Sequence, residues 1–158
     1  TGTDKVSVFA GVRKLSDASA GILCELGSVY TLAGGFGMFV PSSAAANFGF
    51  GSTGSAAAPA TSGSVYPAPT TRILSAAGDI SGDARRLRVG GVLAVENNAD
   101  QGTGNYGNYP LYLFRRAGTS LPFNGWFYGL AITGRLTTDA ETVATERFLA
   151  AKSAVVIP

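Results

Sequence analysis

Residues 86–95 read Arg-Leu-Arg-Val-Gly-Gly-Val-Leu-Ala-Val, with short runs of strand-forming residues on both sides of Gly90-Gly91. Two glycines supply the positive φ angles that a two-residue hairpin turn requires, so the stretch predicts two antiparallel strands. This turn pairs Val89 with Val92 and Leu87 with Ala94, which places all four side chains on one face. Turn chemistry and strand register therefore agree, and they indicate a β-sheet protein.

A second hairpin is predicted downstream at Asn124-Gly125. It would join residues 121–123 to the strand 126–133. A period of two places Trp126, Tyr128, Leu130 and Ile132 on one face of that strand. Residues 111–114 (Leu-Tyr-Leu-Phe) predict another strand between the two hairpins.

The first half of the chain predicts further strands. Residues 4–12 alternate with a period of two, with Val6, Val8, Ala10 and Val12 on one face, as in a half-buried strand. Shorter strands are expected at 22–26, 36–40, 47–50 and 70–76. Residues 51–69 are rich in Gly, Ala, Ser and Pro, as in a linker or a surface loop. A loop is favoured, because each flank alone is too small to bury a core, and we expect one domain over 1–158.

One helix is predicted near the C-terminus. Thr138-Asp139-Ala140-Glu141 forms a capping box pattern, and a helix over about 138–152 would place Ala144, Phe148 and Ala151 against the sheets. The predicted fold class is an all-β antiparallel sandwich with one short C-terminal α-helix. The side chains predicted to be largely buried are Leu87, Val89, Leu113, Tyr128, Leu130, Ile132 and Phe148.

The composition disfavours several classes of protein. Hydrophobic residues make up 46% of the chain and charged residues 14%, enough for one core and too little charge for a disordered tail. A net charge of +2 without a Lys/Arg stripe does not favour nucleic-acid binding. No apolar run approaches the roughly 18 residues of a membrane helix, so membrane insertion is not expected. The chain begins at Thr1, and we expect it to be the C-terminal part of a longer or processed chain.

The sequence carries few groups suited to catalysis. It has no histidine and one cysteine, Cys24, which excludes a nucleophile–histidine dyad, an internal disulfide and the common zinc sites. No strand carries two carboxylates spaced for glycoside hydrolysis. Asp79, Asp83 and Asp100 lie in turns and could form a weak calcium site, but solvated turn carboxylates are favoured. We therefore expect no catalytic residues, no metal and no cofactor.

Residues 100–110 differ from the other loops in their chemistry. They combine amide and carboxylate groups with two tyrosines on a glycine-rich segment. Such groups can hydrogen-bond sugar hydroxyls and stack on a pyranose, although the same mixture suits a structural loop or a subunit contact. With Arg115 or Arg116 nearby, the predicted ligand-binding residues are Asp100, Gln101, Asn105, Tyr106, Asn108, Tyr109 and Arg115.

The second half of the chain resembles a known superfamily. The hairpin Leu87–Val95 is followed by a strand at Leu111–Arg116, the segment Phe123–Ile132, and the capped helix with Glu146–Lys152. This order, over roughly 84–152, resembles the concanavalin A-like lectin/glucanase superfamily in its laminin-G-like form. More narrowly, it is similar to lectin-like C-terminal domains of bacteriophage and prophage virion proteins. The acidic strand motif of the superfamily's enzymes and the calcium cluster of legume-type lectins have no counterpart.

The resemblance implies a jelly-roll sandwich and commonly glycan binding. We accordingly expect a non-catalytic binding domain of a phage tail or fibre protein that recognises host-surface polysaccharide. Such a domain would lie on the virion surface, be extracellular after release, contact other virion subunits and be able to form homo-oligomers. The alternatives are a purely structural virion domain without a ligand, in a tail or a capsid, and, least favoured, a depolymerase.

Overall fold

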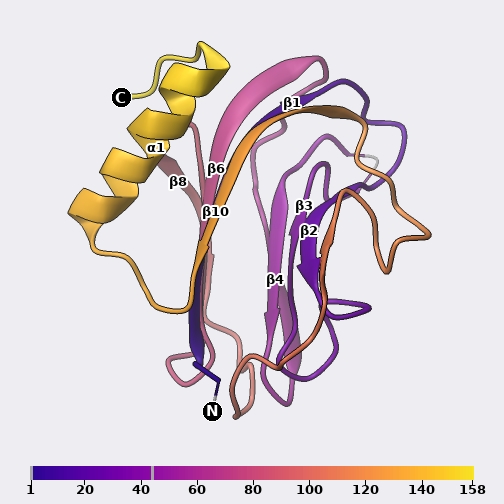
Figure 1. Cartoon of the computed structure of the whole chain (residues 1–158), viewed down its shortest axis with the longest axis vertical. Helices are drawn as coiled ribbons and strands as arrows, with labels where there is room; N and C mark the ends of the chain where they lie inside the picture. Colours follow the sequence, from indigo (N-terminus) through magenta and orange to yellow (C-terminus); the bar gives the residue numbers. More distant parts are fainter. Residues whose placement is uncertain (1, 44) are drawn as a thin grey trace.

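The computed structural model describes residues 2–43 and 45–158, and it contains two five-stranded antiparallel sheets packed face to face (Figure 1). Sheet A has the order β10-β1-β6-β7-β8 and sheet B the order β5-β4-β3-β2-β9. The strands of sheet A are β1 (Lys5–Lys14), β6 (Thr70–Asp79), β7 (Ala84–Val89), β8 (Val92–Asn97) and β10 (Gly125–Thr133). Those of sheet B are β2 (Ile22–Leu26), β3 (Phe36–Phe39), β4 (Gly49–Thr53), β5 (Ala57–Thr61) and β9 (Leu111–Leu113). The predicted jelly-roll sandwich is confirmed.

The core lies between the two sheets. Val6, Val8, Ala10 and Val12 of β1 point into it, as their alternation predicts. They meet side chains that are themselves fully buried: Met38, Phe48, Phe50, Leu74 and Leu87. Strand β1 is nevertheless buried on both faces, because Phe9 on its outer face is covered by the helix. The sequence predicted a half-buried strand and thus underestimated how far β1 is buried.

The helix α1 (Asp139–Ser153) begins at the predicted capping box and packs on the outer face of sheet A (Figure 1). The Thr138 side chain accepts a hydrogen bond from the Glu141 N–H at 3.2 Å, and Glu141 accepts one from the Thr138 N–H at 2.9 Å. The predicted packing face is wrong. Ala144 and Ala151 are exposed and Phe148 is 61% exposed, whereas the buried residues are Glu146, Leu149, Ala150 and Ser153.

Glycines on the sheet explain which helix face is buried. The outer face of sheet A has Gly11 paired with Gly129. A Cβ at Gly129 would lie 2.9 Å from the Leu149 side chain, and one at Gly11 would lie 2.7 Å from the Ser153 hydroxyl. The missing side chains form a hollow that Leu149 and Ser153 fill, so this face of α1 packs inward and Phe148 faces outward.

The two predicted hairpins have different outcomes. Gly90 and Gly91 adopt φ angles of 62° and 83° and join β7 to β8 with Val89 opposite Val92, as predicted. Leu87 pairs with Val95 rather than Ala94, because the register shifts between Leu87 and Arg88. The hairpin at Asn124-Gly125 is wrong, since β10 pairs with β1 and places Gly125 opposite Lys14.

The predicted loop at 51–69 is wrong in part. Strand β4 runs to Thr53, and Ala57–Thr61 forms β5 at the edge of sheet B. Gly51 lies opposite Pro59, and an edge strand tolerates a proline because its outward N–H has no partner to lose. Pairing with β4 therefore outweighs the weak strand propensity of Ala and Pro.

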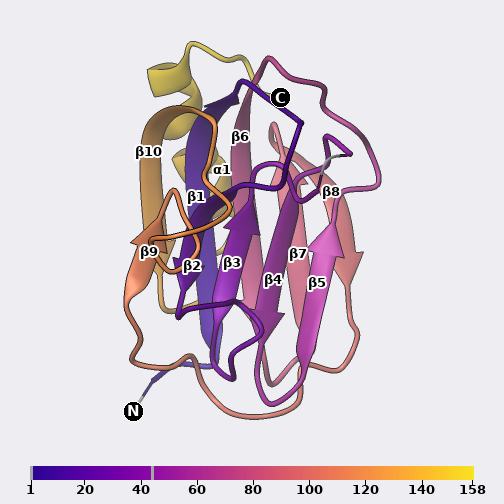
Figure 2. The ribbon, with the colours of Figure 1, turned by 90° about the vertical axis from the view of Figure 1, so that its right-hand side faces the viewer.

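The predicted core is right for only part of its members. Leu87 and Val89 are buried, Tyr128 and Leu130 are half-buried, and Leu113, Ile132 and Phe148 are exposed. Leu113 and Ile132 lie on β9 and β10, which are edge strands on the same side of the sandwich (Figure 2). The predicted common face of β10 holds for Leu130 and Ile132, but a register shift places Phe127 opposite Val12 and Trp126 opposite Arg13. An inward-pointing side chain at an open edge, such as Ile132, still contacts solvent.

Candidate functional site

The loop between β8 and β9, residues 98–110, crosses one end of the sandwich from the β8 edge to the β9 edge (Figure 2). Gln101 anchors its first part and is fully buried. The Gln101 side-chain amide donates to the Asp79 carbonyl at 2.7 Å, and the Gln101 N–H donates to Asp83 Oδ1 at 2.8 Å. This predicted ligand residue holds the loop to the sheet, where a surface ligand cannot contact it.

Tyr106 anchors the second part of the β8–β9 loop. Its hydroxyl lies 2.6 Å from Ser52 Oγ, its ring packs edge-on against Phe36, and it is 7% exposed. Burial raises the pKa of the Tyr106 hydroxyl, so this group stays protonated. Tyr106 is a core residue that fixes the loop rather than a face for a ligand.

The remaining predicted residues of the loop are exposed: Asp100, Asn105, Asn108 and Tyr109. The Tyr109 ring lies against glycine backbone, because a Cβ at Gly107 would be 2.3 Å from its Cε2 atom and one at Gly27 3.4 Å from its Cδ2 atom. The Tyr109 hydroxyl donates to the Ala33 carbonyl at 3.1 Å, and the side chain remains 37% exposed. Tyr109 is thus a fixed aromatic surface close in the chain to two exposed amides, Asn105 and Asn108.

The two arginines after β9 lie apart from this surface. Arg116 binds the fully buried carboxylate of Glu25 through Nε and Nη2 at 3.0 to 3.2 Å, which is a structural contact. Arg115 is exposed, but it follows the far end of β9. Three strand residues advance the chain by roughly 10 Å. The structure therefore separates Arg115 from Tyr109.

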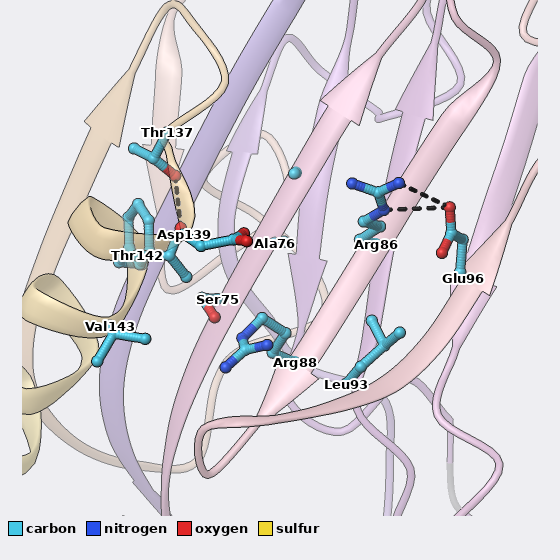
Figure 3. Close-up of a pocket in the computed structure, with 12 residues that line it drawn as sticks. Ser75, Ala76, Arg86, Arg88, Leu93, Glu96, Thr137, Asp139, Thr142 and Val143 are labelled. Atoms are coloured by element: carbon cyan, nitrogen blue, oxygen red, sulfur yellow. Dashed lines mark hydrogen bonds and ion pairs between the residues drawn. The ribbon is translucent and has the colours of Figure 1, made fainter.

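A groove between α1 and the β6–β7–β8 part of sheet A is a second candidate site (Figure 3). Its volume is about 320 Å³. Arg86 and Arg88 of β7, Leu93 and Glu96 of β8, and Thr142 and Val143 of α1 contribute to its lining. The alternation of β7 indicates that Arg86 and Arg88 share a face, but it gives no sign that a helix lies beside them.

Ion pairs hold both arginines of the groove. Arg86 contacts the Glu96 carboxylate at 3.0 Å. Arg88 contacts Glu146 at 2.8 Å, and Ser75 donates to the same carboxylate. The hydrogen bond to Glu146 raises the pKa of Arg88, so its positive charge is permanent. These contacts orient the two guanidinium groups before any ligand arrives.

Other reactive groups have structural roles. Burial raises the pKa of the Cys24 thiol to about 12, so it is neither a nucleophile nor a metal ligand at neutral pH. Within residues 2–43 and 45–158, no group of three or more His, Cys, Asp and Glu side chains is placed to hold a metal ion. Asp79 pairs with Lys5 at 3.0 Å. In the same part of the chain, no helix is long and apolar enough to cross a membrane.

Comparison with known proteins relates the chain to others through its structure. No protein-family model matches the sequence, and no curated protein sequence does either. The CBM40 domain of the Ruminococcus gnavus IT-sialidase, bound to α2,3-sialyllactose, matches with a TM-score of 0.70 at 15% identity, over 92% of this chain and 84% of that chain. The chain therefore has a lectin-like jelly-roll fold.

Two further structures support the same fold. A SAP-like pentraxin from Limulus polyphemus matches with a TM-score of 0.65 at 7% identity, over 88% of this chain and 68% of that one. A leech intramolecular trans-sialidase matches with a TM-score of 0.66 at 13% identity, over 90% of this chain and 23% of that one. At such low identity the likeness establishes the architecture and leaves the site to be argued from this chain's own residues.

Proposed function

We propose that this domain is a non-catalytic carbohydrate-binding module, and that the exposed part of the β8–β9 loop binds a sugar. Tyr109 carries the proposal, because its ring is fixed against Gly107 and Gly27 and still exposes 37% of its surface. A rigid aromatic face can stack on the apolar face of a pyranose at little cost in side-chain entropy. Asn105 and Asn108 supply donors and acceptors for the sugar hydroxyls, whereas Asp100 lies at the β8 end of the loop, away from Tyr109.

The comparisons support the ligand class. One of the similar structures is a carbohydrate-binding domain bound to sialyllactose, and another is a trans-sialidase complexed with 2,7-anhydro-Neu5Ac. The resemblance of residues 84–152 to phage and prophage virion domains supports a finer proposal. In it the ligand is a polysaccharide of the host surface and the domain is exposed on the virion, beside other virion subunits.

Binding assays with a matched pair of variants test the site. Glycans that bind the domain are first identified on an array, and their affinity is then measured by calorimetry. Tyr109→Ala should weaken binding by about tenfold, since an aromatic contact contributes around 1 kcal/mol beyond its buried area. Phe148→Ala is the control, because Phe148 is an exposed aromatic residue on the helix, far from the loop in the chain.

Equal affinities for the two variants would reject the loop as the site. The proposal also excludes hydrolysis, so release of reducing ends from a bound polysaccharide by the pure domain would contradict it.

A purely structural virion domain is the second candidate. It is favoured by the exposed apolar side chains along the β9 and β10 edges, among them Leu111, Leu113 and Phe127. Apolar patches of this kind often mark contacts between proteins. In this case the glycan array stays negative, and a substitution such as Leu111→Asp changes the particle mass measured by light scattering.

A further inference from the structure

We propose that the groove between α1 and sheet A is a second sugar-binding site, which takes one neutral sugar residue or a short neutral oligosaccharide. The inference rests on the proposed function for its ligand class, but the groove shares no residue with the Tyr109 surface. A chain with both sites binds polysaccharide at two points.

The shape of the groove suits a small ligand. Ligand pockets usually span about 300–1,000 Å³, and a volume of about 320 Å³ lies at the small end of that range. The helix residues Asp139, Thr142 and Val143 lie on one side and Leu93 and Glu96 on the other, with β6 and β7 between them (Figure 3). A ligand in this space contacts a rigid sheet and a capped helix, so neither side must become ordered on binding.

Free hydrogen-bond donors face this space. Arg86 and Arg88 alternate along β7 and lie on the same face, roughly 7 Å apart at their Cα atoms. Arg86 uses Nε and Nη2 on Glu96, and Arg88 uses Nε and Nη2 on Glu146 and the Gly91 carbonyl. In the described part of the chain, Nη1 of both arginines has no partner. The carboxylates therefore fix each guanidinium group and leave one edge of it free for a ligand.

Free acceptors lie close to these donors. Asp139 accepts no hydrogen bond from any of the residues that the structure describes, and Glu96 uses only its Oε1 atom. The hydroxyls of Thr137 and Thr142 lie 2.8 Å apart, and Thr137 also donates to Ser7 Oγ at 3.4 Å, so each keeps an acceptor lone pair for a ligand. Each hydroxyl of a sugar both donates and accepts, so a sugar can satisfy the guanidinium edges and the carboxylates together.

The charges favour a neutral ligand over an acidic one. Two guanidinium groups face three carboxylates in and beside the groove, those of Glu96, Asp139 and Glu146. An anion at the free Nη1 atoms would be repelled by all three of these carboxylates. A neutral polyol meets no such repulsion, and the aliphatic side chains of Leu93 and Val143 can cover its C–H groups.

A titration followed by NMR tests the groove directly. D-Glucose, D-galactose, D-mannose and N-acetyl-D-glucosamine are each added to the labelled protein, and backbone amide shifts are recorded. At least one sugar should shift the amides of residues 75–77 and 139–143. Arg86→Gln should weaken that binding by about tenfold, since it removes a charged donor. Arg13→Gln is the control, because Arg13 is another exposed arginine of sheet A and does not line the groove.

The outcomes separate the two sites. If the added sugar still changes the chemical shifts of the groove amides in Tyr109→Ala, the groove is an independent second site, even if the loop binds nothing. The inference is overturned if none of the four sugars shifts the groove amides, if Arg86→Gln and Arg13→Gln bind alike, or if Tyr109→Ala abolishes the groove shifts. Arg86 is 55% exposed at its side chain, so Arg86→Gln is expected to fold and leave the test readable.

Discussion

Removing Arg88 should destabilise the fold far more than neutralising its partner, Glu146. The Glu146 side chain is 2% exposed, whereas that of Arg88 is 30% exposed. Arg88→Met leaves a buried carboxylate whose remaining partner is the Ser75 hydroxyl. Glu146→Gln leaves a guanidinium group that still reaches water and the Gly91 carbonyl. The two halves of one ion pair therefore have unequal consequences.

The expected magnitudes follow from these contacts. Losing one partner of a buried ion pair costs about 3–5 kcal/mol, and the partial exposure of Arg88 places Arg88→Met near the lower end, at about 3 kcal/mol. Glu146→Gln should cost about 1 kcal/mol, because the amide keeps the shape and one acceptor. The double variant Arg88→Met with Glu146→Leu should recover most of the loss, since it buries no charge.

Urea denaturation at neutral pH measures all three variants, with an unchanged m value as the check for two-state unfolding. The reasoning is refuted if Arg88→Met costs less than about 1 kcal/mol, or if it costs no more than Glu146→Gln. A double variant less stable than Arg88→Met would refute it as well.

Three further predictions concern the core, the helix cap and metals. Leu87→Ala should lower the free energy of unfolding by about 2–5 kcal/mol and Ile132→Ala by about 1 kcal/mol, because Leu87 is fully buried and Ile132 is 37% exposed. Urea denaturation that shows the reverse order would contradict the assigned faces. The hydrogen bond from Arg135, with that from Thr138, lowers the pKa of Glu141 from 4.5 to about 2, so its stabilising contribution is present above pH 4.5 and lost as the pH falls towards 2. Glu141→Gln should therefore flatten the dependence of melting temperature on pH in that window, and identical profiles would show that the cap does not titrate. EDTA should leave the melting temperature unchanged, and a clear drop would point to a metal near Asp79, Asp83 and Asp100.

The predicted site shows where sequence reasoning succeeds and where it stops. Composition alone marked the β8–β9 loop as unusual, and the structure leaves Asp100, Asn105, Asn108 and Tyr109 exposed there. It could not separate these from Gln101 and Tyr106, because an amide or a tyrosine suits a ligand and a buried anchor equally well. Their partners, Asp79 and Ser52, lie on distant strands, and only the folded chain brings them within hydrogen-bonding distance.

Local patterns determined the elements of this protein whose physics is local. Gly90-Gly91 specified a turn through its own φ angles, and Thr138 with Glu141 specified the helix start through contacts within one turn. Alternation in β1 specified which side chains point inward. Each of these features depends on neighbours only a few residues away, so the sequence expresses it directly.

Tertiary structure alone decided how these elements meet. It paired β10 with β1 instead of residues 121–123, made a strand of Ala57–Thr61, and set the hollow at Gly11 and Gly129 against Leu149 and Ser153. It also placed α1 beside Arg86 and Arg88 to form the groove. These outcomes depend on contacts between segments far apart in the chain, where packing and backbone pairing outweigh the preference of any single residue.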